Sequence, residues 1–131
     1  MYLLDTCTLL WWLAEPDRLP PKVRDTISDP AIAIVVSVVT LWEVLVKVRL
    51  GKIRIRTEGD EPYAFLVKTL DASGFERRPL LEQDLRHLTH LPVLHRDPFD
   101  RMLICQAIEG ALTLVTPDPT IQRYPIRTLW V

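Results

Sequence analysis

The stretch Ala31–Ser37 reads AIAIVVS and is apolar without interruption until its final serine. It is rich in β-branched Ile and Val, and its apolar residues do not alternate with polar ones. A continuous apolar run of this length and composition is typical of a strand that is buried on both faces. The stretch therefore predicts an inner strand of a sheet that is covered on both sides.

Helix and strand patterns alternate on either side of this strand. The segment that follows it, TLWEVLVKVRLG (40–51), predicts a helix with cationic side chains in its last turns and a stop at Gly51. Three more strands are predicted at YLLD (2–5), LTLVTPD (112–118) and IRTLWV (126–131). Further helices are predicted at TLLWWLAE (8–15), Val23–Ile27, PYAFLVKTLDASG (62–74), PLLEQDLRHLTHL (79–91) and the segment from Pro98 to Gly110. This order indicates an α/β fold with a mainly parallel sheet, formed by residues 1–131 as a single domain.

The composition is that of an ordinary globular protein, with 48% hydrophobic and 25% charged residues. Cys7 and Cys105 both lie in apolar runs, so we expect free buried thiols rather than a disulfide framework. Asp5 comes too early for the apolar core of a signal peptide, and the longest apolar run, near Ala31–Val39, is too short to span a membrane. We therefore expect a soluble, cytoplasmic protein without a membrane partner.

Polar side chains stand at the ends of three predicted strands, namely Asp5, Ser37 and Asp118. The carboxyl ends of parallel strands share one edge of the sheet, and functional groups collect there. Two of the predicted helices also carry an acid close to their start, Glu43 and Asp100. Four carboxylates are thus expected to meet at one edge of the sheet.

Each of these acids also has a purely structural interpretation. Asp5 is suited to cap the helix that follows it. Thr40 and Glu43 form a T-x-x-E pattern, and for Glu43 alone a capping box is the favoured interpretation. Asp118 lies between two prolines, where Asp is a frequent turn residue.

The segment HRDPFDR (95–101) contains two aspartates that differ in their expected tasks. Asp97 followed by Pro98 is a standard helix start. At about 100° per residue, Asp100 points in the same direction as Leu103 and Ile104, toward the interior. An inward carboxylate is costly without a partner, so Asp100 has no adequate structural explanation.

The clustered acids predict a metal site. Converging carboxylates without a cationic side chain repel one another, and Mg²⁺ or Mn²⁺ removes that repulsion through oxygen ligands. The three histidines (His87, His90 and His95) show no zinc-ligand pattern with cysteine and are expected to be surface or satisfied residues.

The charge distribution leaves room for a polyanionic partner. The net charge is −1, and it becomes −1 + 5 = +4 if a cation neutralises the five acids Asp5, Glu43, Asp97, Asp100 and Asp118. Basic residues gather in the run from Lys47 to Arg56 and again at Arg77 and Arg78, although such runs are more often only a solvated face.

Four segments carry a resemblance to a known family: LLDTCTLLWWL (3–13), SVVTLWEVLVKVRLGKI (37–53), HRDPFDRMLICQA (95–107) and LTLVTPDPTIQRYPIRTLW (112–130). In order and spacing, from Tyr2 to Trp130, the chain resembles a PIN domain, specifically a VapC-type toxin of a bacterial toxin–antitoxin pair. The resemblance implies a Rossmann-like three-layer α/β/α sandwich. It also implies a Mg²⁺- or Mn²⁺-dependent endoribonuclease. The sequence departs from the family at Pro117, which puts the position of Asp118 in question.

The resemblance also suggests roles for individual residues. The implied catalytic acids are Asp5, Glu43, Asp100 and Asp118, and the implied metal ligands are Asp5, Asp97, Asp100 and Asp118. Asp97 is expected to touch the metal directly or through water. The residues expected to bind substrate are Thr6, Lys47, Arg96 and Arg101. The expected partners are RNA, a cognate antitoxin and a second copy of the chain.

Two other functions are alternatives to this one. A phospho-acceptor receiver domain also gathers acids at strand ends, but it needs a lysine from the C-terminal half, and the last lysine here is Lys68. The remaining alternative is a PIN-like RNA-binding or interaction module without catalysis.

Overall fold

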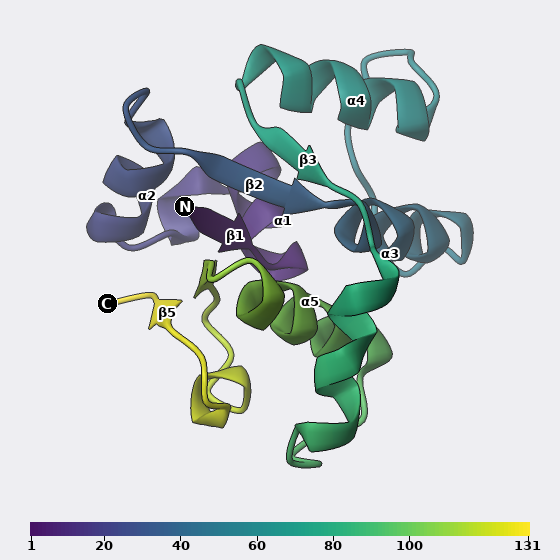
Figure 1. Cartoon of the computed structure of the whole chain (residues 1–131). Coiled ribbons are helices and arrows are strands. Elements are labelled where there is room, and N and C mark those ends of the chain that lie inside the picture. Colours follow the sequence, from purple (N-terminus) through teal and green to yellow (C-terminus); the bar gives the residue numbers. More distant parts are fainter.

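Five parallel strands form one sheet in the order β3-β2-β1-β4-β5 in the computed structural model, which describes residues 1–131 (Figure 1). Their bounds are Tyr2–Leu4 (β1), Ile34–Ser37 (β2), Glu76–Arg78 (β3), Thr113–Val115 (β4) and Thr128–Leu129 (β5). Every neighbouring pair in the sheet is parallel. The predicted parallel sheet is confirmed, with β1 at its centre.

The α-helices are α1 (Thr6–Ala14), α2 (Pro21–Ser28), α3 (Val38–Arg49), α4 (Pro62–Ala72) and α5 (Pro98–Glu109). Three 3₁₀-helices complete the fold: η1 (Pro16–Arg18), η2 (Glu82–His90) and η3 (Ile121–Arg123). None of the helices is both long and apolar enough to cross a membrane. Both cysteines are free, as expected; Cys105 is buried, whereas Cys7 is only partly buried.

Apolar side chains of the inner strands point alternately to two separate cores. Leu4 and Val36 pack in one core with side chains from α1, α2 and α4. Leu3 and Val35, one position earlier on the same strands, pack in the other core with side chains of α5. The sheet is therefore the middle layer of an α/β/α sandwich, with α5 on the opposite side from α1 (Figure 1). Burial of both faces explains why AIAIVVS lacks polar alternation.

The structure corrects two expectations about element type and extent. The predicted strand 31–37 begins only at Ile34. The predicted helix at 79–91 is a 3₁₀-helix over Glu82–His90. The apolar residues Leu85, Leu88 and Leu91 are spaced by three, and both helix types bring residues i and i+3 to one face, so this short pattern does not separate them.

No strand is predicted at Glu76–Arg78, where the structure has β3, because the sequence Glu-Arg-Arg contains no apolar residue. It lies at the edge of the sheet and pairs only with β2. Charged residues are common on edge strands, where they discourage pairing with other chains. The apolar periodicity that reveals inner strands therefore has no counterpart here.

The predicted capping box at Thr40 is wrong. Helix α3 begins at Val38, and its N-cap is Ser37, whose hydroxyl accepts a hydrogen bond from the Val39 amide at 3.0 Å. Thr40 is thus already inside the helix, and Glu43 lies in the second turn. Glu43 is therefore free of a capping role.

Candidate metal centre

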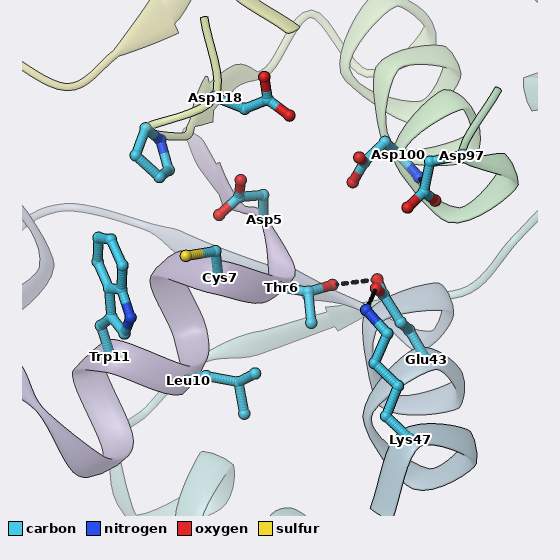
Figure 2. Close-up of a pocket in the computed structure, with 11 residues that line it drawn as sticks. Asp5, Thr6, Cys7, Leu10, Trp11, Glu43, Lys47, Asp97, Asp100 and Asp118 are labelled. Carbon is cyan, nitrogen blue, oxygen red and sulfur yellow. Dashed lines mark hydrogen bonds and ion pairs between the residues drawn. The ribbon is translucent and has the colours of Figure 1, made fainter. Parts of the chain in front are cut away.

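A cleft of about 340 Å³ opens beyond the carboxyl ends of β1 and β4 (Figure 2). Its walls come from the starts of α1 and α5, from α3 and from the loop after β4. Eleven residues line it: Asp5, Thr6, Cys7, Leu10, Trp11, Glu43, Lys47, Asp97, Asp100, Pro117 and Asp118. The cleft brings together all five acids that the sequence singled out.

Asp5 combines the two roles that the sequence left open. Its Oδ1 accepts a hydrogen bond from the Thr8 amide at 2.8 Å, so it caps α1. It is also only 3% exposed and lines the cleft. Burial raises the pKa of its carboxyl, and hydrogen bonds from Thr116 and Thr8 oppose that rise. The same side chain therefore caps the helix and lines the cleft.

Glu43 is the one cleft acid with a cationic side chain as partner. Thr6 Oγ1 donates to its Oε1 at 2.6 Å, and Lys47 Nζ lies 2.5 Å from its Oε2 (Figure 2). The hydrogen bond to Glu43 raises the pKa of Lys47. One helical turn places Lys47 beside Glu43, so the repulsion expected among carboxylates without a cationic partner concerns the aspartates and not Glu43.

The two aspartates of HRDPFDR differ in position as the sequence predicted: one caps the helix and the other points inward. Asp97 caps α5, and its Oδ1 accepts hydrogen bonds from the amides of Phe99 at 2.9 Å and Asp100 at 3.1 Å. The side chain of Asp100 is 18% exposed and points into the cleft (Figure 2). Burial, followed by the charges of Asp97 and Glu43, raises the pKa of Asp100 to about 7.

Asp118 likewise forms a turn and lines the cleft. Its amide donates to Thr116 Oγ1 at 3.1 Å, and its Oδ1 accepts from the Thr120 amide at 2.8 Å. The carboxylate lies across the cleft from Asp100 (Figure 2). Pro117 before it lines the same cleft, so the unusual proline does not remove Asp118 from the cluster.

His95 is a neighbour of the cleft that the sequence expectations set aside. His95, Asp100 and Asp118 can each offer one ligand atom such that all three atoms lie within 4.8 Å of one another. Its Nδ1 lies 2.9 Å from Tyr124 Oη. The available signal was its position in HRDPFDR, two residues before Asp97.

Of the residues expected to bind substrate, some line the cleft and others do not. Thr6 and Lys47 line the cleft, but both bind Glu43. Arg96 is exposed and does not line the cleft. Arg101 donates through Nη1 to the carbonyl of Pro92 at 3.1 Å and to Tyr124 Oη at 3.3 Å, also outside the lining. Their roles toward a substrate stay predictions.

The donor set suits a hard divalent cation. Asp5, Asp97 and Asp118 have no ion pair, and Asp100 is near only the imidazole of His95. Burial, together with the charges of neighbouring acids, raises the pKa of both Asp5 and Asp100. Carboxylate oxygens are the ligands that Mg²⁺ and Mn²⁺ prefer, so a divalent cation would balance the negative charge of these residues.

Comparison with known families decides the relationship. The family model described as PIN domain matches residues 2–126. The chain belongs to the PIN domain family. The sandwich described above is thus the PIN fold, as the resemblance implied.

Solved structures share the fold of this PIN domain at low sequence identity. VapBC2 from Rickettsia felis, bound to a DNA fragment from its promoter, is 17% identical with a TM-score of 0.73, covering 99% of this chain and 98% of that one. DNA-bound VapBC from Salmonella typhimurium is 19% identical with a TM-score of 0.67, covering 98% and 96%. FitAcB from Neisseria gonorrhoeae is 19% identical with a TM-score of 0.59, covering 98% and 96%. No curated protein matches this sequence.

Proposed function

We propose that this PIN domain is a Mg²⁺- or Mn²⁺-dependent endoribonuclease and the VapC-type toxin of a toxin–antitoxin pair. The observation that carries the proposal is the cleft, in which four aspartates without a cationic side-chain partner stand beside the Glu43–Lys47 pair. PIN domains are typically nucleases. The similarity in fold to the VapBC complexes supports the toxin assignment.

The aspartates are the proposed ligands of the cation. Asp5 and Asp100 are its principal ligands, with Asp97 and Asp118 beside them or one water further away. A bound divalent cation would activate water and offset charge on the phosphate during displacement. The Thr8 amide fixes the orientation of Asp5, and the amides of α5 fix that of Asp97.

Glu43 and Asp118 have different proposed tasks because their carboxylate oxygens differ in the hydrogen bonds that they already accept. Both oxygens of Glu43 already accept hydrogen bonds, from Thr6 and from Lys47, so Glu43 holds these two groups in place at the cleft. Asp118 uses Oδ1 in its turn, which leaves Oδ2 to orient the attacking water and accept its proton. Attack on phosphorus breaks the bond to the 3′ oxygen and leaves a 5′-phosphate and a 3′-hydroxyl.

The RNA and the protein partners belong to the same proposal. The basic run that follows Glu43 and the exposed Arg96 are candidates for contacts with RNA phosphates. A cognate antitoxin would cover the cleft and place an Arg among the carboxylates, and the toxin would form a homodimer.

The test compares Asp5→Asn and Asp100→Asn with wild type for growth arrest and for Mg²⁺-dependent RNA cleavage. We expect each variant to lose at least about 100-fold in cleavage rate, since each loses a charge that holds the cation. Asp25→Asn is the matched control, because Asp25 is exposed and outside the cleft. Undiminished cleavage by both cleft variants would refute the proposal, as would wild-type cleavage that persists in EDTA.

A further inference from the structure

The imidazole of His95 lies between Tyr124 and the cleft. One ring nitrogen, Nδ1, is 2.9 Å from Tyr124 Oη, and the other, Nε2, is 3.4 Å from Asp100 Oδ2. Nε2 is shielded from solvent and has no hydrogen bond within the chain. A buried ring nitrogen without a hydrogen-bond partner, in a histidine that lies near Asp100 and Asp118, needs an explanation.

The hydrogen bonds of Tyr124 determine which ring nitrogen carries the proton. Tyr124 Oη accepts from the Leu94 amide and from Arg101 Nη1, both at 3.3 Å. A phenol oxygen has two acceptor positions and one O–H donor, so both acceptor positions are occupied. The remaining O–H of Tyr124 must donate, and His95 Nδ1 is the acceptor at 2.9 Å.

A neutral imidazole that accepts at Nδ1 carries its hydrogen at Nε2. Nε2 lies 3.4 Å from Asp100 Oδ2, close enough for its N–H dipole to act on the carboxylate, although the two groups form no hydrogen bond in this structure. If Nε2 were instead a metal ligand, Nδ1 would carry the hydrogen and would become a third donor to Tyr124 Oη, which has no acceptor position left. The contacts of Tyr124 therefore favour a donor role for His95 over a ligand role.

We infer that His95 is a positioning residue, whose Nε2–H orients the Asp100 carboxylate and whose tautomer is fixed by Tyr124 and Arg101. This inference rests on the proposed metal-dependent function. It gives Arg101 a task inside the fold: its guanidinium occupies one acceptor position of Tyr124 and so directs the phenol hydrogen to His95. Groups that orient a metal ligand typically contribute 10- to 100-fold to metal affinity.

The first measurement is the tautomer of His95 in the wild-type protein, from long-range ¹H–¹⁵N NMR correlations of the imidazole at pH 8. We expect hydrogen on Nε2 both without and with saturating Mg²⁺. Tyr124→Phe removes only the hydroxyl, and we expect it to populate the Nδ1–H form as well. A wild-type His95 with hydrogen on Nδ1, in either state, would overturn the inference.

The second measurement is the Mg²⁺ and Mn²⁺ affinity of His95→Ala, by calorimetry. We expect a loss of about 10- to 100-fold, and partial recovery in His95→Gln, whose amide N–H can replace the Nε2 donor. His87→Ala is the matched control, because His87 also contacts an acid, Glu109 at 2.7 Å, but lies outside the cleft. Its affinity is expected to equal that of wild type.

The outcomes separate this inference from the proposed function. If wild type binds the cations and His95→Ala binds them equally well, the positioning role fails while the proposed function stands. If wild type binds neither cation, the proposed function fails, and the role of His95 fails with it. Thermal unfolding of each metal-free variant shows whether it is folded, and the tautomer measurement on wild type requires no substitution.

Discussion

Asp100 shows what a single carboxylate contributes when it lies in a partly covered cleft. Burial and the charges of Asp97 and Glu43 raise the pKa of Asp100 to about 7, so near neutral pH a proton occupies part of the population. In the metal-free protein its ionised form is therefore unfavourable. The same side chain becomes favourable once a cation is present, because the cation supplies the missing positive charge.

The pH dependence of metal-free stability follows from this shift. Unfolded Asp100 ionises near its ordinary pKa of 3.8, whereas the folded carboxyl ionises at about 7. Between these values the folded state binds more protons, so the contribution of Asp100 to the free energy of unfolding falls as the pH rises through that window. Asp100→Asn removes this contribution. We expect it to raise the thermal midpoint of the metal-free protein at pH 7.5 by about 3 °C.

Thermal unfolding in EDTA at several pH values checks this expectation. The difference between Asp100→Asn and wild type should shrink toward pH 5, where wild-type Asp100 is largely protonated. Asp25→Asn, on the exposed surface, should follow wild type at every pH. A difference that grows toward pH 5 would show that the sign of the pKa shift is wrong.

At the scale of elements, the first turn of α5 separates structural from chemical roles. Asp97 is the N-cap and binds two backbone amides, whereas Asp100, one turn later, points into the cleft. Pro98 between them fixes the backbone at the first helical position. The turn thus places two carboxylates at the cleft while using only one to begin the helix.

Substitutions at Asp97 can separate capping from charge. Asp97→Ala removes the cap and should lower the free energy of unfolding by about 1 kcal/mol, whereas Asp97→Asn keeps an oxygen that can accept from the same amides and should cost only a few tenths. Both variants should lose less Mg²⁺ affinity than Asp100→Asn does. Urea unfolding and calorimetry measure the two effects. Equal stability of the Ala and Asn variants would argue against the capping role.

Helix α5 also shows where periodicity misleads. At about 100° per residue, the polar residues Gln106 and Glu109 lie on the far side of the helix from Asp100, yet Gln106 is fully buried. Its side chain donates to the carbonyl of Pro79, and Glu109 contacts His87 of η2. Segment η2 covers this face of the helix. A polar residue in a helical pattern therefore does not by itself indicate solvent.

At the scale of the whole molecule, the cleft exists because chain segments far apart in sequence end at the same edge of the sheet. Asp5 follows β1, Asp118 follows β4, and Glu43 belongs to the helix that follows β2. Parallel strands point all these ends in one direction. If the proposed function is right, this concentration of negative charge would link the stability of the domain to the binding of a cation.

Cation binding should therefore stabilise the folded domain. At a concentration 100 times the dissociation constant, Mg²⁺ or Mn²⁺ should add about 2.7 kcal/mol to the free energy of unfolding. The stabilisation should be larger above pH 7 than below, because binding must displace the proton of Asp100. Thermal unfolding with and without the cation measures this effect, and EDTA should reverse it. Asp5→Asn should abolish most of it, and an undiminished shift in that variant would exclude Asp5 as a ligand.

Much of this fold was accessible from local pattern. Apolar runs predicted the inner strands, and Asp97-Pro98 predicted the start of α5 to the residue. The edge strand β3 and the helix type of η2 were not accessible, because neither depends on apolar periodicity. The capping box at Thr40 failed because Ser37, which ends β2, had already capped α3.

By itself, the sequence determined the order of the inner strands and of the main helices and the set of acids, since these depend on residue type and short-range spacing. Only the tertiary structure decided which side chains contact those acids. It placed Lys47 and Thr6 on Glu43, left the aspartates without a cationic side chain, and set His95 between Tyr124 and Asp100. The physical reason is that partners of a buried charge are chosen by proximity in space, which strand order and helix packing fix.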